Sequence, residues 1–304
     1  MNKSLARALF RPRSVALIGA SGDATKNTAR PQRYLTKHGY KGRILPINPG
    51  RDEIFGLPSY KSVSTAPGPV DHAFIMTPAA TVPGILADCA KAGVRIASIF
   101  SDGFAETGKE GRARQEAMVK AARKAGMRLI GPNSMGVIDI QAGAAITVNA
   151  ILEMPELIPG SLGVVSQSGT MLGALMSRGA ARGVGFSRMV SIGNEADLSV
   201  GEVADALVDD PETTAILLFL ETIRDAASLA AMARRAHKAG KPVIAYKLGR
   251  SAAGRALAIS HSGAIAGDDA AADAFFRDCG ILRVDQMETL MEIAPLARRR
   301  TQFM

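Results

Sequence analysis

The feature that most constrains this chain is an alternation of short apolar runs with helix-like segments, which occurs twice in series. The first series has the runs SVALIGA (14–20), GRILPINP (42–49), DHAFIMTP (71–78), VRIASIF (94–100) and MRLIGPNS (127–134). Between them the pattern predicts helices over 24–39, with a proline interruption, over 80–92 and over 109–125. Buried strands in alternation with helices are typical of a parallel sheet covered on both faces.

A second series begins near residue 160. Its runs are GSLGVVSQSGT (160–170), GFSRMVSIG (185–193), TTAILLFLET (213–222) and KPVIAYKLG (241–249). Helices are predicted over 169–180, 199–208 and 225–239, and a last helix and short strand precede the end of the chain. The stretch 140–160 has no clear helical period and contains two prolines. We therefore predict two doubly wound α/β domains, 1–145 and 146–304.

Composition excludes several classes of protein. Apolar runs such as 215–220 are too short to span a membrane, and the basic N-terminus is not followed by the apolar core of a secretory signal. Cys89 and Cys279, the two cysteines, fall on different predicted helices and form neither a metal pair nor a disulfide framework. We expect a cytoplasmic protein with no membrane partner and no metal ligands of its own.

The formal net charge of +9 points to an anionic partner. The basic residues are scattered and no aromatic residues interleave with them, so a platform that stacks single-stranded nucleic acid is not expected. A small ligand that carries several phosphates explains the charge better than nucleic acid does.

Ligands of open parallel sheets bind at the carboxyl ends of the strands. The first strand ends in GASGD (19–23), which lacks the second and third glycines of a G-x-G-x-x-G fingerprint, and no carboxylate follows the second strand before Asp52. This pattern argues against NAD and favours a phosphate-binding turn, with a plain tight turn as the alternative. The candidate cofactor-binding residues lie at or near these strand ends: Gly19, Ser21, Gly22, Pro46, Asn48, Thr77, Pro78, Ser101, Gly103 and Asn133.

The second series has its own candidate anion site. VVSQSGT places hydroxyls and successive N–H donors at the start of a predicted helix, an arrangement that suits phosphate, although the lysine of a P-loop is missing. A serine that only caps the helix is the alternative. The candidate phosphate-binding residues are Ser166, Gln167, Ser168, Gly169, Thr170, Gly193, Asn194 and Gly263.

One histidine has no structural explanation in the sequence. His261 lies among small residues in AISHSGAIAG (258–267), whereas the other three end helices or open a strand: His38, His72 and His237. An imidazole with small neighbours is accessible to a phosphoryl group, and a carboxylate at its other ring nitrogen would fix its tautomer. Glu221, at the end of a buried strand, is the candidate carboxylate. The alternatives are a loop histidine and a glutamate that caps the next helix.

Five blocks in this order resemble one family, the NDP-forming acyl-CoA synthetases, which are relatives of the succinyl-CoA synthetase alpha subunit: SVALIGAS, GPNSMGV, VVSQSGT, SIGNEADL and SHSGAIAG. The resemblance covers residues 8–298. It implies a Rossmann-like CoA-binding domain followed by a flavodoxin-like succinyl-CoA-ligase domain. It also implies that His261 is phosphorylated and that Glu221 supports it. Ser262 stands where threonine is common, and ETI where EGV is usual.

The resemblance further implies a reaction and its partners. Acyl-CoA, phosphate and ADP are interconverted with a carboxylic acid, CoA and ATP through an acyl phosphate and a phosphohistidine. ATP or ADP and Mg²⁺ would bind an ATP-grasp module, for which nothing after residue 298 provides the sequence. We therefore expect an alpha-type subunit or part of a longer fused protein, in an oligomer. The acid, the choice of ATP or GTP and a non-catalytic CoA-sensing role remain open.

Overall fold

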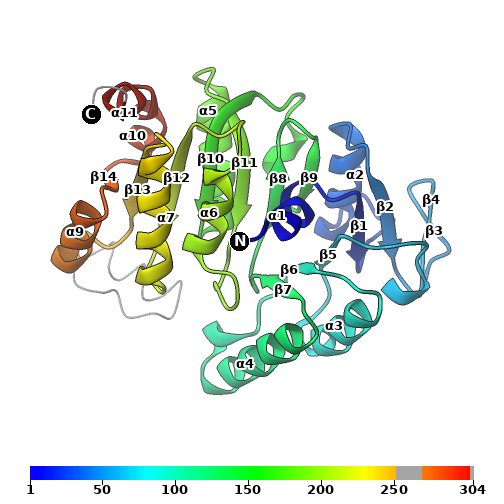
Figure 1. Ribbon diagram of the computed structural model, residues 1–304. Coiled ribbons are helices and arrows are strands. Elements are labelled where there is room, and N and C mark those ends of the chain that lie inside the picture. The colour runs from blue at the N-terminus through cyan, green and yellow to red at the C-terminus, as the bar shows by residue number, and fades with distance from the viewer. Residues whose placement is uncertain (251–268, 302–304) are drawn as a thin grey trace.

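The computed structural model describes residues 1–250 and 269–301 (Figure 1). Its helices are α1 (Lys3–Phe10), α2 (Arg30–Lys37), α3 (Val82–Lys91), α4 (Lys109–Lys124), α5 (Gly169–Ala180), α6 (Val200–Val208), α7 (Ala226–Lys238), α9 (Asp269–Asp278), α10 (Met287–Glu292) and α11 (Ala294–Thr301). Its strands are β1 (Ser14–Ile18), β2 (Arg43–Ile47), β3 (Glu53–Ile54), β4 (Leu57–Pro58), β5 (His72–Ile75), β6 (Ile96–Ile99), β7 (Arg128–Ile130), β8 (Gly136–Asp139), β9 (Ala144–Thr147), β10 (Pro159–Ser166), β11 (Phe186–Ser191), β12 (Ala215–Leu220), β13 (Val243–Lys247) and β14 (Leu282–Val284).

Two sheets organise these elements. The first has the parallel order β2-β1-β5-β6-β7, and the second has the order β14-β13-β12-β10-β11-β8-β9, in which β8 and β9 are antiparallel. In each parallel part the first strand lies between the second and the third, so the helices that follow these strands fall on opposite faces. The predicted pair of doubly wound α/β domains is confirmed.

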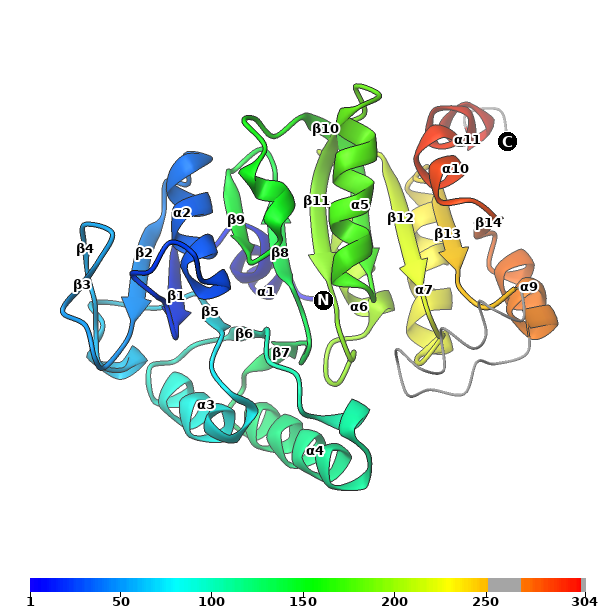
Figure 2. The same ribbon diagram turned by 180° about the vertical axis from the view of Figure 1, so that it is seen from behind.

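Helices cover both faces of each sheet. In the second sheet, α6 and α7 lie in front in Figure 1, and α5 lies in front in the reverse view of Figure 2. In the first sheet, α3 and α4 bury Leu86 and Met118 on one face, and α2 buries Leu35 on the other. Several strands between these layers, among them β1, β5 and β12, are buried along their whole length. This explains why the strands appear as continuous apolar runs rather than as alternating patterns.

Most predicted helices are close to the observed ones. The α5 range is the predicted 169–180, because glycine and threonine follow a strand at the point where the chain turns. The helix predicted over 24–39 is shorter, since α2 begins at Arg30 and accommodates Pro31 in its first turn, where no N–H partner is needed.

Several elements have no counterpart in the prediction, among them α1, β8 and β9. The amphipathic α1 lies between the two sheets (Figure 1), and its Leu9 and Phe10 are buried in one core cluster with Val190 of β11. The guanidinium of Arg188, also on β11, lies 5.0 Å from the centre of the Phe10 ring. The N-terminal helix is therefore packed against the second sheet, although it precedes the first in sequence.

The division between the sheets also lies elsewhere in the chain. β8 and β9 pair with β11 in the second sheet, whereas the predicted boundary at residues 145/146 falls inside β9. The chain passes from the first sheet to the second between β7 and β8, and the predicted domain boundary stays a prediction. The reason is that these two short strands complete the edge of a sheet whose other strands come later in the chain, which no local pattern reveals.

None of the helices in the described parts of the chain combines the length and the apolar character that crossing a bilayer requires.

Candidate active site

A cavity of about 410 Å³ lies at the carboxyl edge of the first sheet. Four of the predicted cofactor-binding residues line it: Gly19, Asn48, Thr77 and Pro78. Gly19 has a φ of +84°, and a Cβ at this position would lie 2.8 Å from Cγ2 of Thr77. Any side chain would therefore be strained there and would press into the wall of the cavity.

The remaining predicted residues of this edge are not among those that line the cavity. Ser21 and Gly22 follow β1, and the Ser21 hydroxyl accepts a hydrogen bond from the Asp23 amide at 3.1 Å. Ser101 donates its hydroxyl to the carbonyl of Thr77, and the Gly103 amide donates to Oε1 of Glu106 at 2.6 Å.

Pro46 is the exception among these residues. It lies inside β2, buried and paired with Leu17, instead of at the end of the strand. The cavity is lined by Pro49, three residues further on. A role of Pro46 in binding a cofactor stays a prediction.

The start of α5 follows β10 through a tight turn. The Ser166 hydroxyl donates to the carbonyl of Ser168 at 2.6 Å and accepts from the Ser168 amide at 3.1 Å. Ser168 occupies the N-cap position but its side chain makes no capping hydrogen bond. At Gly169 a Cβ would lie 2.5 Å from Cγ of Met135, so glycine allows α5 to begin against the chain that leads into β8.

A second cavity, of about 440 Å³, joins this helix start to Glu221. Ser168 and Thr170 line it on one side, and Phe219 and Tyr246, whose rings stack with centroids 5.3 Å apart, line another. Glu221 is only 6% exposed. The structure thus brings the predicted carboxylate and the predicted anion-binding helix start to one cavity.

Gln167 holds the chain at Glu221. Its Oε1 accepts hydrogen bonds from the backbone amides of Glu221 at 2.7 Å and Thr222 at 3.0 Å, and its Nε2 donates to the Thr222 carbonyl at 2.9 Å. These three bonds tie the end of β12 to the end of β10. The side chain of Gln167, predicted to bind phosphate, is engaged with the protein.

Asn133 and the loop after β11 connect the two sheets. Asn133 lines a small cavity of about 20 Å³ together with Gln167, Gly193 and Glu221, a space about the size of one water molecule. The Asn194 amide donates to the Pro132 carbonyl at 2.8 Å, and its side chain donates to Glu106 and, at 3.2 Å, to Gln115. The donors of Asn194 are therefore used between the domains, and its role in phosphate binding stays a prediction.

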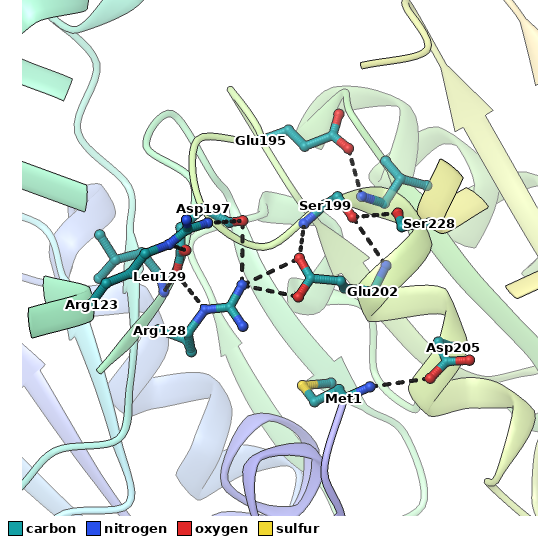
Figure 3. A network of polar contacts seen from close by, with 11 residues as sticks. Met1, Arg123, Arg128, Leu129, Glu195, Asp197, Ser199, Glu202, Asp205 and Ser228 are labelled. Atoms are coloured by element: carbon teal, nitrogen blue, oxygen red, sulfur yellow. Dashed lines mark hydrogen bonds and ion pairs between the residues drawn. The ribbon is translucent and has the colours of Figure 1, made fainter. Parts of the chain in front are cut away.

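Sequence reasoning missed four residues that organise this region: Glu106, Glu195, Asp197 and Arg224. The buried Asp197 carboxylate accepts hydrogen bonds from Nε of Arg123 at 2.5 Å, from Nε of Arg128 at 2.9 Å and from the Leu129 amide at 2.7 Å (Figure 3). Glu195, two residues earlier, is 3% exposed at its side chain. The block SIGNEADL contains both acidic residues, but only the fold brings their partners near.

His261 and Gly263 lie outside the described residues. Their predicted roles are untouched by the geometry given above.

The profile of the CoA binding domain matches residues 13–139, and that of the succinyl-CoA ligase like flavodoxin domain matches residues 159–297. The chain is 40% identical to the alpha subunit of acetate–CoA ligase (ADP-forming) I of Pyrococcus furiosus, over 91% of this chain and 60% of that protein. It is 36% identical to acetate–CoA ligase (ADP-forming) II of Archaeoglobus fulgidus, over 94% of this chain and 42% of that protein.

Solved structures agree with these matches. The dinucleotide forming acetyl-coenzyme A synthetase 1 of Ca. Korarchaeum cryptofilum, in complex with phosphate and ADP, superposes with a TM-score of 0.88 and 34% identity. That match covers 97% of this chain and 62% of the other. The chain thus spans about two fifths to three fifths of the length of the relatives that it resembles.

Proposed function

Because this chain belongs to the NDP-forming acyl-CoA synthetases and joins their CoA-binding domain to their succinyl-CoA-ligase-like flavodoxin domain, we propose that it is the alpha-type part of such an enzyme. In this proposal the complete enzyme interconverts an acyl-CoA, phosphate and ADP with a carboxylic acid, CoA and ATP. A beta-type subunit or further domain with an ATP-grasp fold binds the nucleotide and Mg²⁺.

The first cavity is the proposed CoA site. CoA supplies the thiol that carries the acyl group, and Gly19, Asn48, Thr77 and Pro78 would hold part of it. The missing Cβ of Gly19 supports this assignment, since it leaves the backbone of the turn open to close approach by a phosphate. Ser21, Gly22, Ser101 and Gly103 complete the proposed set on the surrounding turns.

The proposed chemistry of the second domain has three balanced steps. Phosphate displaces CoA from the acyl-CoA to give an acyl phosphate. The bond between phosphorus and the acyl oxygen then breaks as a ring nitrogen of His261 takes the phosphoryl group, which releases the carboxylic acid. ADP finally accepts the phosphoryl group from His261.

One observation supports this scheme more than any other: Glu221, Ser168 and Thr170 line the same cavity, at the N-terminus of α5. The helix dipole and the amides of the first turn favour phosphoryl oxygens there. A buried carboxylate beside them would bind and orient an imidazole while it becomes positively charged. Together they would position a phosphoryl group for transfer and neutralise its charge.

The test is transfer of labelled phosphate from ATP, with Mg²⁺ and the ATP-grasp subunit of one of these synthetases, to the 304-residue chain. We expect an acid-labile, alkali-stable label on His261, located by mass spectrometry. His261→Ala should abolish the label, and Glu221→Gln should slow it by about tenfold or more, the equivalent of one charge-assisted hydrogen bond. Phosphate on Ser260 or Ser262, or undiminished labelling of the alanine variant, would contradict the proposal.

A further inference from the structure

The proposed chemistry leaves open what holds the Glu221 segment in place. Its backbone is bound by Gln167, whose Oε1 must face the amides of Glu221 and Thr222 for both hydrogen bonds to form. A carboxamide has two ends of similar size, so the opposite orientation would turn an NH₂ group toward these N–H donors. The Thr222 carbonyl, which accepts from Nε2 of Gln167 at 2.9 Å, favours the observed orientation, and a second acceptor at Nε2 would strengthen that preference.

Glu195 provides this second acceptor. Its Oε2 accepts a hydrogen bond from Nε2 of Gln167 at 2.7 Å, and its Oε1 accepts one from the Val200 amide at 2.7 Å. An ionised carboxylate has only acceptors, so the end of Gln167 that faces it has to be the NH₂ group. The oxygen of Gln167 is thereby directed toward Glu221 and Thr222.

The loop that carries Glu195 is itself fixed. Glu195 has a φ of +54°, an uncommon conformation for a residue with a side chain, and burial is the main reason that its pKa is raised. Two residues further on, Asp197 binds Arg123 and Arg128 of the first domain (Figure 3). Arg224 has its Nε 4.0 Å from Oε2 of Glu195. The loop is therefore fixed to the first domain through Asp197, while the Glu195 carboxylate accepts from the first amide of α6.

We propose that Glu195 is a positioning residue, which orients the carboxamide of Gln167 and through it fixes the backbone at Glu221. The three residues come from three different strand ends, after β11, β10 and β12, so the contact arises only at the carboxyl edge of the second sheet. The consequence for phosphoryl transfer rests on the proposed function, whereas the consequence for the backbone does not.

The experiment exchanges the two functional groups. Glu195→Gln presents an amide to Gln167 and weakens the preference for its orientation, and Gln167→Glu sets two carboxylates against each other. The double variant swaps the groups: the carboxylate then at position 167 has acceptors for the amides of Glu221 and Thr222, but it can no longer donate to the Thr222 carbonyl. The carboxamide then at position 195 donates to that carboxylate while its oxygen accepts from the Val200 amide. Each single variant should weaken the hydrogen bonds between residue 167 and the backbone at Glu221 and Thr222, and the double variant should restore part of them.

The first readout is hydrogen exchange of the Glu221 and Thr222 amides in the full 304-residue chain. We expect about tenfold faster exchange in each single variant, which corresponds to the loss of roughly one buried hydrogen bond. The double variant should recover part of the protection. Glu202→Gln is the matched control, because Glu202 lies on the same segment, with hydrogen bonds to the Ser199 amide and Arg128 but none to Gln167. Exchange unchanged in both single variants, or raised equally in the control, would overturn the proposal.

The second readout is the rate of His261 labelling with the ATP-grasp subunit. Glu195→Gln should lower the maximal rate by about tenfold and leave the KM for ATP unchanged, and the swap should restore part of the rate. If wild type is labelled and both single variants are labelled at the same rate, the positioning role is contradicted. No labelling of wild type at all would instead contradict the proposed function, and the exchange result would still decide the role of Glu195. Thermal unfolding of each variant reports whether it is folded. If Glu195→Gln does not fold, the Gln167→Glu variant tests the proposal instead.

Discussion

The side-chain amide of Asn194, in the second domain, donates a hydrogen bond to the carboxylate of Glu106 in the first. The other oxygen of Glu106 accepts from the amides of Gly103 and Phe104, in the turn after β6. Burial opposes the ionisation of Glu106, but these hydrogen bonds outweigh it and hold its pKa below the usual value. One carboxylate therefore orders a turn near the proposed CoA site and joins it to the second domain.

Replacing Glu106 by alanine should weaken both of these contacts. The loss of several hydrogen bonds to a half-buried carboxylate costs about 1–3 kcal/mol, which lowers Tm by several degrees in a domain of this size. Differential scanning calorimetry measures the effect, and small-angle scattering would detect looser domains. An unchanged Tm would show that the contact contributes nothing to stability.

Gly19→Ala tests the proposed CoA site. We expect CoA affinity to fall by about tenfold or more, because a methyl group would enter the cavity wall at a backbone conformation that disfavours it. Gly39→Ala is the matched control, since Gly39 has a similar φ of +76° with nothing within 4 Å of the added carbon. Both variants should be less stable than wild type, but only Gly19→Ala should have a lower affinity for CoA.

Calorimetry with CoA and with NAD completes this test. Binding of CoA should weaken as salt is added, because its phosphates meet N–H groups and basic side chains. Equal CoA affinity of the Gly19 and Gly39 variants would remove this turn from the site, and tighter binding of NAD than of CoA would contradict the proposed cofactor.

Asp197→Ala should be the most destabilising of these substitutions. The buried carboxylate pairs with Arg123 and Arg128 and accepts a hydrogen bond from the Leu129 amide. Its removal leaves the buried Leu129 amide without this acceptor and Arg123 without this partner, whereas Arg128 keeps Glu202, at a cost of about 3 kcal/mol. Denaturant unfolding measures this cost. Glu288→Ala is the control: Glu288 and Arg178 form an exposed pair 3.1 Å apart, for which we expect about 0–1 kcal/mol. Similar losses in both variants would contradict the role given to Asp197.

His72 should make stability depend on pH. It is fully buried, its Nε2 lies 2.8 Å from the Ser98 hydroxyl, and burial lowers its pKa from 6.5 to about 4. Between these values the unfolded chain binds a proton that the folded chain does not, so stability falls as pH decreases from about 6.5 to about 4. The loss contributed by this residue is up to about 3 kcal/mol.

Denaturant unfolding at several pH values measures the His72 effect as a difference between wild type and His72→Gln. Acidic groups affect both proteins alike, so the free energy of unfolding of the variant should depend less steeply on pH in this window. Parallel curves would show that His72 does not titrate with folding.

Much of this protein is determined by local sequence. Strand runs such as 215–220, the helix start at Gly169 and the end of β12 at Glu221 follow from short patterns of apolar, small and capping residues, because these act over one or two turns of chain. The same local blocks carry the family resemblance. They were sufficient to predict two doubly wound domains and to place Ser168, Thr170 and Glu221 at strand ends.

The tertiary structure decided which residues from distant parts of the chain lie side by side. Only pairing between distant segments adds β8 and β9 to the second sheet, places Pro46 inside a strand, and turns Asn194 toward Glu106. Glu195 is an ordinary acidic residue in the sequence, and it gains its position from burial against Gln167, 28 residues earlier. Contacts of this kind depend on which strand ends adjoin across a sheet, and no local pattern of residues contains that information.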